Sequence, residues 1–270
     1  CASVTMVNPE VMETGDVRAT AEVDAAAAGA AAKYAAQLGV GLYKGLELDV
    51  GAGVVPSVQE RPYAEEDRLK STFFTAGTAF GFELDQAGEK VPLKLGLDVH
   101  REVASYEATS LTFGSWGLLS PGTSESWIDR VTWRYRLHGS VGVKPVSWMM
   151  LYAGGAIVLS THDVVMYDET YESNEGEDVV VSGYRSEAAF ESYAIIDGIA
   201  GLYIPFGESN FGLQFEGSFT LPPLILPHAS WAEGDPLYSP FRDIAQVNLG
   251  LVWTIDAIHK PRPPASAGGL

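Results

Sequence analysis

Apolar and polar residues alternate through most of this chain, and the alternation is clearest in residues 210–221. There Phe211, Leu213 and Phe215 share one face, and Gln214 and Glu216 share the other. Successive side chains of a β-strand point to opposite faces, so this period of two predicts a strand with one apolar and one polar face.

The same period recurs along the sequence and predicts about ten strands. They cover residues 17–25, 36–42, 46–54, 72–83, 93–100, 130–143, 148–160, 192–205, 210–221 and 246–255. The connections alternate in length. Residues 43–45, 85–90, 144–147 and 206–210 predict short turns, whereas residues 55–68, 105–127, 161–187 and 222–241 predict long loops. Short turns at one end and long loops at the other are typical of an antiparallel up-and-down transmembrane β-barrel, with periplasmic turns and extracellular loops.

Composition supports this all-β interpretation and excludes several functions. Hydrophobic residues make up 46% of the 270 residues and charged residues 19%, yet no apolar run reaches the roughly 18 residues of a transmembrane helix. The net charge is −18, which argues against nucleic-acid binding because phosphate contacts need clustered Lys and Arg. The acidic stretch 162–187 is expected to be a solvated loop, with a divalent-cation or partner site as the alternative.

The polar face carries charges of both signs together with many Gly and Ala residues, as expected for a crowded lumen. Buried charges need partners, so these side chains are predicted to form a lumenal network. The predicted network comprises Arg130, Arg134, Arg136, Glu47, Asp49, Glu83, Asp98, Asp197 and Glu216, and the same face also holds Arg18, Lys94, Glu22 and Asp24. The alternative is a soluble barrel whose apolar face points inward and whose charges are solvated.

The single cysteine is Cys1, which excludes disulfide frameworks and zinc sites of several cysteines. Cys1 is followed by the small residues Ala2 and Ser3, and this start resembles a mature bacterial lipoprotein. The resemblance implies an acyl lipid such as palmitate on Cys1 and a lipid-anchored protein in the outer membrane. Residues 1–15 are then expected to be a lipidated tether, residues 16–256 the barrel, and residues 257–270 a disordered periplasmic tail.

The pattern of hairpins, turns and loops over residues 17–256 resembles the small bacterial outer-membrane β-barrel proteins. Ten strands leave little free lumen once side chains fill it. The expected role is therefore structural or accessory: the barrel would present long loops to partners in a larger cell-envelope complex. The expected partners are outer-membrane lipid and other envelope proteins. The alternative is a narrow channel or a small-ligand-binding barrel with a charged lumen, and a barrel hydrolase ranks third.

Two short motifs resemble catalytic pairs, but the chain is not expected to be an enzyme. His138 and Ser140 resemble the His-x-Ser pair of outer-membrane lipid A deacylases, but both are placed on the lumenal face, away from a lipid substrate. Asp98 and His100 resemble the Asp-x-His pair of ten-stranded outer-membrane proteases, but the acidic pair needed to position water lies at the wrong end. No cofactor or metal ion is expected, because the sequence has no phosphate-binding loop and no His/Cys cluster.

Overall fold

The computed structural model describes residues 6–7, 10–26, 33–58, 68–86, 89–113, 121–146, 148–174, 177–187, 191–206, 210–220 and 245–256. Cys1, the loop predicted at 222–241 and the tail predicted at 257–270 lie outside these residues. Among the described residues, no helix is long and apolar enough to cross a membrane.

The described residues form eleven strands in one sheet. In chain order they are β1 (Asp16–Ala26), β2 (Lys33–Tyr43), β3 (Leu46–Val58), β4 (Arg68–Gln86), β5 (Glu89–Phe113), β6 (Pro121–Val146), β7 (Met149–Asn174), β8 (Glu177–Glu187), β9 (Glu191–Pro205), β10 (Phe211–Thr220) and β11 (Ala245–Asp256).

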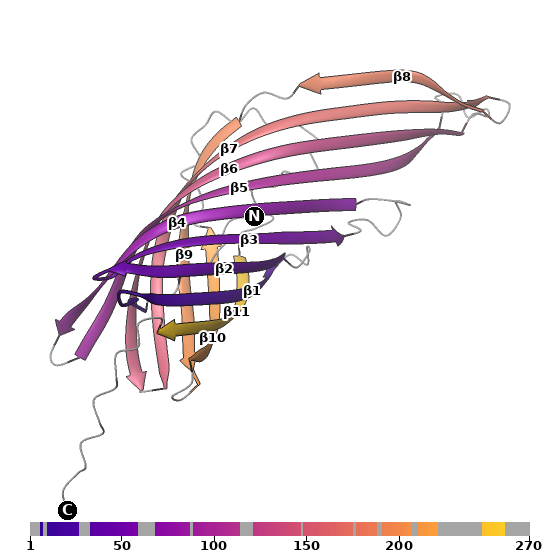
Figure 1. The fold of residues 1–270 in the computed structure, drawn as a ribbon. Helices are drawn as coiled ribbons and strands as arrows, with labels where there is room; N and C mark the ends of the chain where they lie inside the picture. Colours follow the sequence, from indigo (N-terminus) through magenta and orange to yellow (C-terminus); the bar gives the residue numbers. More distant parts are fainter. Residues whose placement is uncertain are drawn as a thin grey trace, which may run out of the picture.

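The sheet closes into a ten-stranded antiparallel barrel (Figure 1). Each strand pairs with its neighbours in sequence, and the pairing of β1 with β11 closes the ring. The one departure is β8, which pairs with β7 outside the ring, so that β7 pairs with β9 inside it. Closure leaves no free edge within the barrel wall, which is the arrangement a membrane-spanning sheet requires. The predicted up-and-down barrel is therefore confirmed.

Short turns connect the strands at one end of the barrel, as the sequence predicts. The tightest joins β2 to β3, where Tyr43 pairs with Leu46 across a two-residue loop. Both loop residues have positive φ, +40° at Lys44 and +85° at Gly45, as in the type I′ turn that suits the twist of a β-hairpin. The Gly45 carbonyl accepts a hydrogen bond from the Gly81 N–H at 2.8 Å. A side chain at Gly45 would overlap the Gly81 carbonyl oxygen, so the close approach requires glycine.

The two faces of the wall differ sharply. Large apolar side chains point outward on every barrel strand: Leu38 is 46% exposed, Leu95 59% and Leu137 56%. Polar and charged side chains on the alternate positions point inward and are buried, among them Glu216 and Arg134. The expectation for residues 210–221 is confirmed where it is described, because Phe211, Phe215 and Phe219 are exposed while Gln214, Glu216 and Ser218 are buried.

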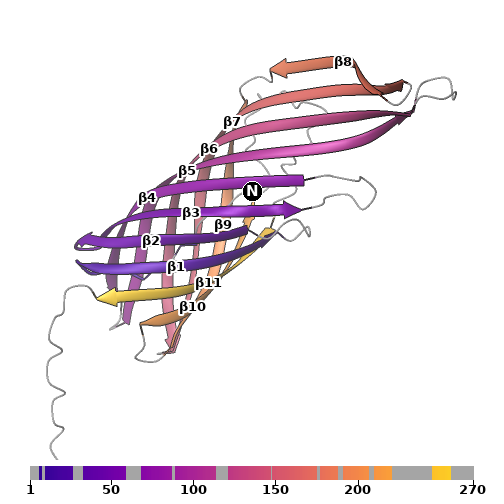
Figure 2. The ribbon, with the colours of Figure 1, turned by 45° about the vertical axis from the view of Figure 1, so that its right-hand side comes forward.

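Three strands run far beyond the barrel wall (Figure 2). β5 has 25 residues and β6 and β7 have 26 each, whereas β10 has 10 and β1 has 11. About 9–11 residues suffice for a strand to cross a bilayer. Together with β8, the surplus forms a sheet that extends past the end opposite the short turns, and we call it the β5–β8 extension.

This extension corrects two loop predictions. Residues 105–127 were expected to be a loop, but β5 continues to Phe113 and β6 begins at Pro121, paired residue for residue. Residues 161–187 were also expected to be a loop, but most of them belong to β7 and β8, which pair as a hairpin. The acidic residues expected in a solvated loop, such as Asp168 and Glu169, therefore lie on paired strands.

Candidate functional site

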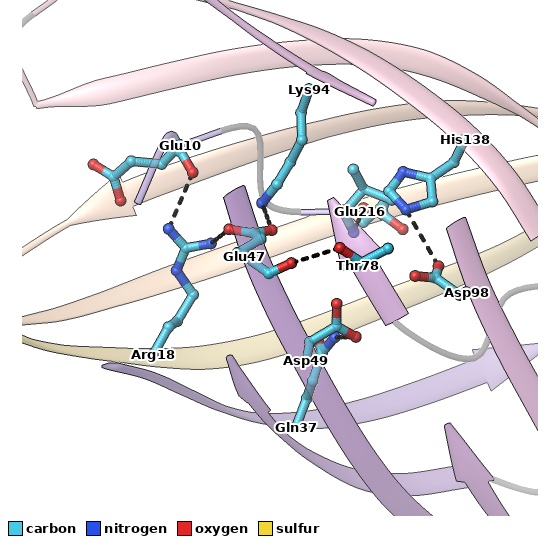
Figure 3. Close-up of polar contacts among 11 residues, drawn as sticks. Glu10, Arg18, Gln37, Glu47, Asp49, Thr78, Lys94, Asp98, His138 and Glu216 are labelled. Carbon is cyan, nitrogen blue, oxygen red and sulfur yellow. Dashed lines mark hydrogen bonds and ion pairs between the residues drawn. The ribbon is translucent and has the colours of Figure 1, made fainter. Parts of the chain in front are cut away.

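The barrel lumen gathers the buried charges into separate clusters. The cluster nearest the short turns is centred on Glu47 of β3, between Lys94 of β5 and Arg18 of β1 (Figure 3). Lys94 Nζ is in direct contact with Glu47 Oε1, and Arg18 Nη1 lies 3.8 Å from Glu47 Oε2. The Glu47 carboxylate is therefore held between two cations, one from each side of β3.

A second cluster joins Asp98 of β5 to two side chains of β6. Asp98 Oδ2 lies 3.3 Å from His138 Nε2 and 3.8 Å from Arg136 Nη1. The register places Asp98 directly opposite Arg136, which makes this contact a consequence of strand pairing. Neither His138 Nδ1 nor Ser140 Oγ forms a hydrogen bond with any described residue. The structure therefore joins His138 to Asp98 and does not join it to Ser140.

A third cluster is centred on Glu102 of β5, further from the short turns. Glu102 Oε2 accepts a hydrogen bond from Arg134 Nη1 at 2.9 Å, and Glu102 Oε1 accepts one from Ser71 Oγ at 2.7 Å. His100 Nε2 lies 3.8 Å from the same carboxylate, so His100 belongs with Glu102 and not with Asp98. Glu102 is 3% exposed, and a carboxylate so deeply buried needs such partners.

The opposite wall is different, because its acidic residues accept hydrogen bonds from backbone N–H groups and from a tyrosine hydroxyl. Glu22 of β1 and Glu216 of β10 face the lumen and are 4% and 1% exposed. Glu216 Oε2 accepts hydrogen bonds from Tyr152 Oη at 3.1 Å and from the Val7 N–H at 2.8 Å. Glu22 Oε2 accepts one from the Met6 N–H at 3.3 Å. We call Glu22 and Glu216 the acidic wall.

The partners from the backbone belong to a stretch that was expected to be a tether. Met6, Val7 and residues 10–12 lie inside the barrel, and Glu13 is exposed where the stretch reaches the short-turn end. We call Met6, Val7 and residues 10–13 the lumenal segment. Met6, Val7 and Met12 are buried. Arg18 Nη2 donates a hydrogen bond to the Glu10 carbonyl at 3.1 Å, as Figure 3 shows. The segment therefore fills the lumen between the Glu47 cluster and the acidic wall.

A small cavity lies beside the lumenal segment. A cavity of about 40 Å³ lies next to Met6 and Met12, and its other lining residues include Arg18, Glu47 and Lys94. That volume suits one or a few water molecules. Side chains of the wall and of the lumenal segment line this cavity.

The structure brings most of the predicted network residues to the lumen, though not all into one network. Arg134, Arg136, Glu47, Asp98 and Glu216 take part in the contacts above. Arg130 is buried on β6, Asp49 accepts a hydrogen bond from Gln37 Nε2 at 2.9 Å, and Asp197 accepts one from Thr220 Oγ1 at 2.8 Å. Glu83 lies elsewhere: it is exposed at the end of β4, where it pairs with Lys90 Nζ at 2.7 Å.

Several lumenal residues were missing from the predicted network. Glu102 was left out because the predicted strand ends at His100, whereas β5 continues past Glu102. Tyr152 lies on β7, where the two faces of the sequence are poorly separated.

Within the described residues, no group of three or more His, Cys, Asp or Glu side chains is arranged to hold a metal ion.

Comparison with known proteins gives similarity in structure alone. No protein-family model matches the chain, and no curated protein sequence matches it. The N-terminal β-barrel domain of Pseudomonas aeruginosa OprF is 11% identical over 90% of this chain and 100% of that chain, with a TM-score of 0.32. A mutant of the monoaromatic hydrocarbon channel TodX is 13% identical over 90% and 89%, with a TM-score of 0.35. A P. aeruginosa FadL homologue is 7% identical over 88% of each chain, with a TM-score of 0.31. At these identities the similarity concerns the β-barrel fold and nothing finer.

Proposed function

We propose that this chain is an outer-membrane β-barrel with a structural or accessory role, which presents the β5–β8 extension to a protein partner. Apolar side chains face outward and charged side chains face the lumen, and this arrangement supports a membrane location. Outward Leu, Val and Phe side chains surround the barrel, and a continuous apolar surface of this size would be unfavourable in water. Buried charged side chains and the lumenal segment occupy the lumen, which favours a role that needs no wide pore.

The observation that carries the proposal is the length of β5, β6 and β7. Their surplus residues are not needed to cross a bilayer, yet they are fully paired with one another. Beyond Glu107 the partner of β5 among the described strands is β6 alone, and the partner of β8 is β7 alone. The extension therefore offers two strand edges whose N–H and C=O groups can pair with a strand of another protein.

A deletion within the extension tests this role. We would replace residues 166–187 with a short Gly-Ser linker, which leaves the pairing of β7 with β9 intact. The full chain, purified in mild detergent, is expected to carry an envelope protein in fixed stoichiometry, and the deletion variant is expected to lose it. A variant lacking residues 257–270 is the matched control and should keep the partner. A partner-free full chain, or equal binding by the deletion variant, would refute the role.

The proposal assigns no catalysis to the barrel. It is supported by the placement of His138, which contacts Asp98 while Ser140 makes no hydrogen bond to a described residue. A His138→Ala variant is expected to leave lipid and peptide processing in the envelope unchanged. The lipid anchor at Cys1 stays a prediction from the first three residues, and the intact mass of the purified chain would test it.

A further inference from the structure

The lumenal segment occupies the barrel without being part of its wall. None of its described residues is a member of a strand, and three hydrogen bonds join its backbone to side chains of the barrel interior. Two of these are the N–H groups of Met6 and Val7, which reach Glu22 and Glu216. The β-ladders that close the barrel would all remain if the segment left.

Glycines on the lumenal face make room for the segment. A side chain at Gly41 of β2 would overlap the carbonyl oxygen of Glu13, and a Cβ at Gly250 of β11 would lie 2.6 Å from Met6 Sδ. A Cβ at Gly81 of β4 would lie 3.1 Å from Val11 Cγ2. These positions form a groove that fits the segment and that larger residues would close.

A tight turn joins the segment to the wall at the short-turn end. Asp16 Oδ2 accepts a hydrogen bond from the Glu13 N–H at 2.8 Å, and the Asp16 N–H donates to the Glu13 carbonyl at 3.1 Å. Gly15 has a φ of +87°, which glycine adopts without strain, and its N–H donates to the Gly41 carbonyl at 2.8 Å. The segment can therefore swing out about this turn while β1 stays in the sheet.

The wall that the segment covers carries buried acidic and amide oxygens. Glu22 Oε1, Glu216 Oε1, Gln214 Oε1 and Asn248 Oδ1 are buried oxygens without a hydrogen-bond donor among the described residues. Asn248 lies directly opposite Glu216 in the ladder, and Gln214 lies next along the same face of β10. Departure of the segment would remove the N–H donors of Met6 and Val7 as well. The exposed oxygens would then favour a small cation over an anion.

We propose that the lumenal segment is a removable plug and that its departure opens a narrow path for small monovalent cations, selected by Glu22 and Glu216. The inference goes beyond the accessory role. Conductance does not depend on a partner bound to the β5–β8 extension, so either conclusion can fail while the other stands.

Planar-bilayer recording of the full chain and three variants tests the plug. Gly41→Leu should displace the segment at Glu13, and Val7→Pro removes the N–H that binds Glu216 without altering the barrel wall. Gly139→Leu is the matched control, because Gly139 lies on the outward face of β6. We expect the full chain and Gly139→Leu to be closed, and Gly41→Leu and Val7→Pro to conduct K⁺ in preference to Cl⁻. Barrel folding is checked by the migration of unheated samples in gels.

A crosslink reports the position of the segment independently of current. Val11 Cα lies 3.5 Å from the ideal Cβ position of Gly81, so a Val11→Cys/Gly81→Cys pair, made with Cys1→Ser, should oxidise readily. Adding Gly41→Leu should abolish the crosslink. Retention of the crosslink would contradict the conclusion that the glycine groove holds the segment. Loss of the crosslink without conductance, in a folded barrel, would overturn the plug.

Carboxylate variants test the selectivity. Glu22→Gln and Glu216→Gln, each combined with Val7→Pro, should shift the reversal potential in a KCl gradient toward the value of a non-selective pore. An unchanged reversal potential, or an anion-selective Val7→Pro barrel, would overturn the assignment of Glu22 and Glu216.

Discussion

Phe215 and Glu216 are neighbours on β10, yet their surroundings are opposite: Phe215 is 39% exposed on the outside of the barrel and Glu216 is 1% exposed inside it. The same contrast holds around the whole wall. In a soluble protein the apolar side would be buried and the charges would face water. Here the exterior is the apolar side, which implies that the surrounding solvent is lipid.

The two faces are therefore stabilised by different forces. Outward side chains need only match the hydrocarbon, so their identity matters little as long as they are apolar. Inward side chains are buried charges, and each depends on particular partners held by the register of the strands. On the inside, the substitutions that lower the free energy of unfolding most should be those that remove one partner of a buried pair. On the outside, they should be those that introduce a charge.

The largest effect is expected from Glu102→Leu on the inside. Loss of this carboxylate removes the hydrogen bond and ion pair that it forms with the buried Arg134, and breaking a buried pair costs about 3–5 kcal/mol. Unfolding by urea in lipid vesicles, followed by tryptophan fluorescence, measures the change. The double variant Glu102→Leu/Arg134→Leu should recover much of the loss because both charges of the buried pair are removed together. Equal instability of the single and double variants would contradict the pairing.

Leu95→Arg should have the next largest effect, on the outside. Leu95 lies on β5 about midway between Lys90 and Arg101, and its side chain is exposed on the outside of the barrel. The guanidinium carbon of Arg101 lies 5.7 Å from the centroid of the Trp133 ring, as expected near a membrane interface. A lipid-facing arginine near the midplane costs about 2–4 kcal/mol. Leu95→Ile is the control and should be close to neutral. A neutral Leu95→Arg would mean that this face meets water.

The adjacent positions on β10 give the sharpest comparison. Glu216→Leu leaves the Tyr152 hydroxyl and the Val7 N–H without their acceptor, at a cost of about 2 kcal/mol. Phe215→Leu changes a lipid-facing residue to another apolar residue and should cost about 0.5 kcal/mol. The same urea titration measures both. A larger loss for Phe215→Leu would reverse the assignment of the two faces.

A smaller effect is expected where two outward aromatics meet. Phe211 and Trp253 stack with ring centroids 5.7 Å apart and an interplanar angle of 8°. A double-mutant cycle with Phe211→Leu and Trp253→Leu should give a coupling of about 1 kcal/mol. A coupling of zero would show that the outward face has no specific contacts at this position.

The alternation of the sequence was enough to predict the barrel and its two faces. In the membrane-crossing part, every second side chain must be apolar, so the pattern identified the strands and placed residues such as Arg136 and Asp98 in the lumen. The short turns were equally readable, because the two-residue loop at Lys44 and Gly45 requires special backbone angles.

Two features escaped prediction for physical reasons. The β5–β8 extension lies beyond the length that lipid contact requires, so neither face of residues 105–127 needs to be apolar and the period of two fades. The lumenal segment has no period of two because contacts with the barrel interior, and not strand pairing, hold its described residues in place. Its traces in the sequence were indirect: the apolar Met6, Val7, Val11 and Met12 lie outside the alternating segments, and glycines such as Gly41 and Gly250 lie on the lumenal face.

Membrane partition of the Cys1→Ser chain tests the inverted barrel most directly. The substitution removes the residue at which a lipid is predicted, so any remaining attachment must come from the protein wall. We expect the variant to stay in the membrane pellet through alkaline carbonate and urea washes and to need detergent for release. A variant that is released by the washes and stays monomeric in water without detergent would contradict the account.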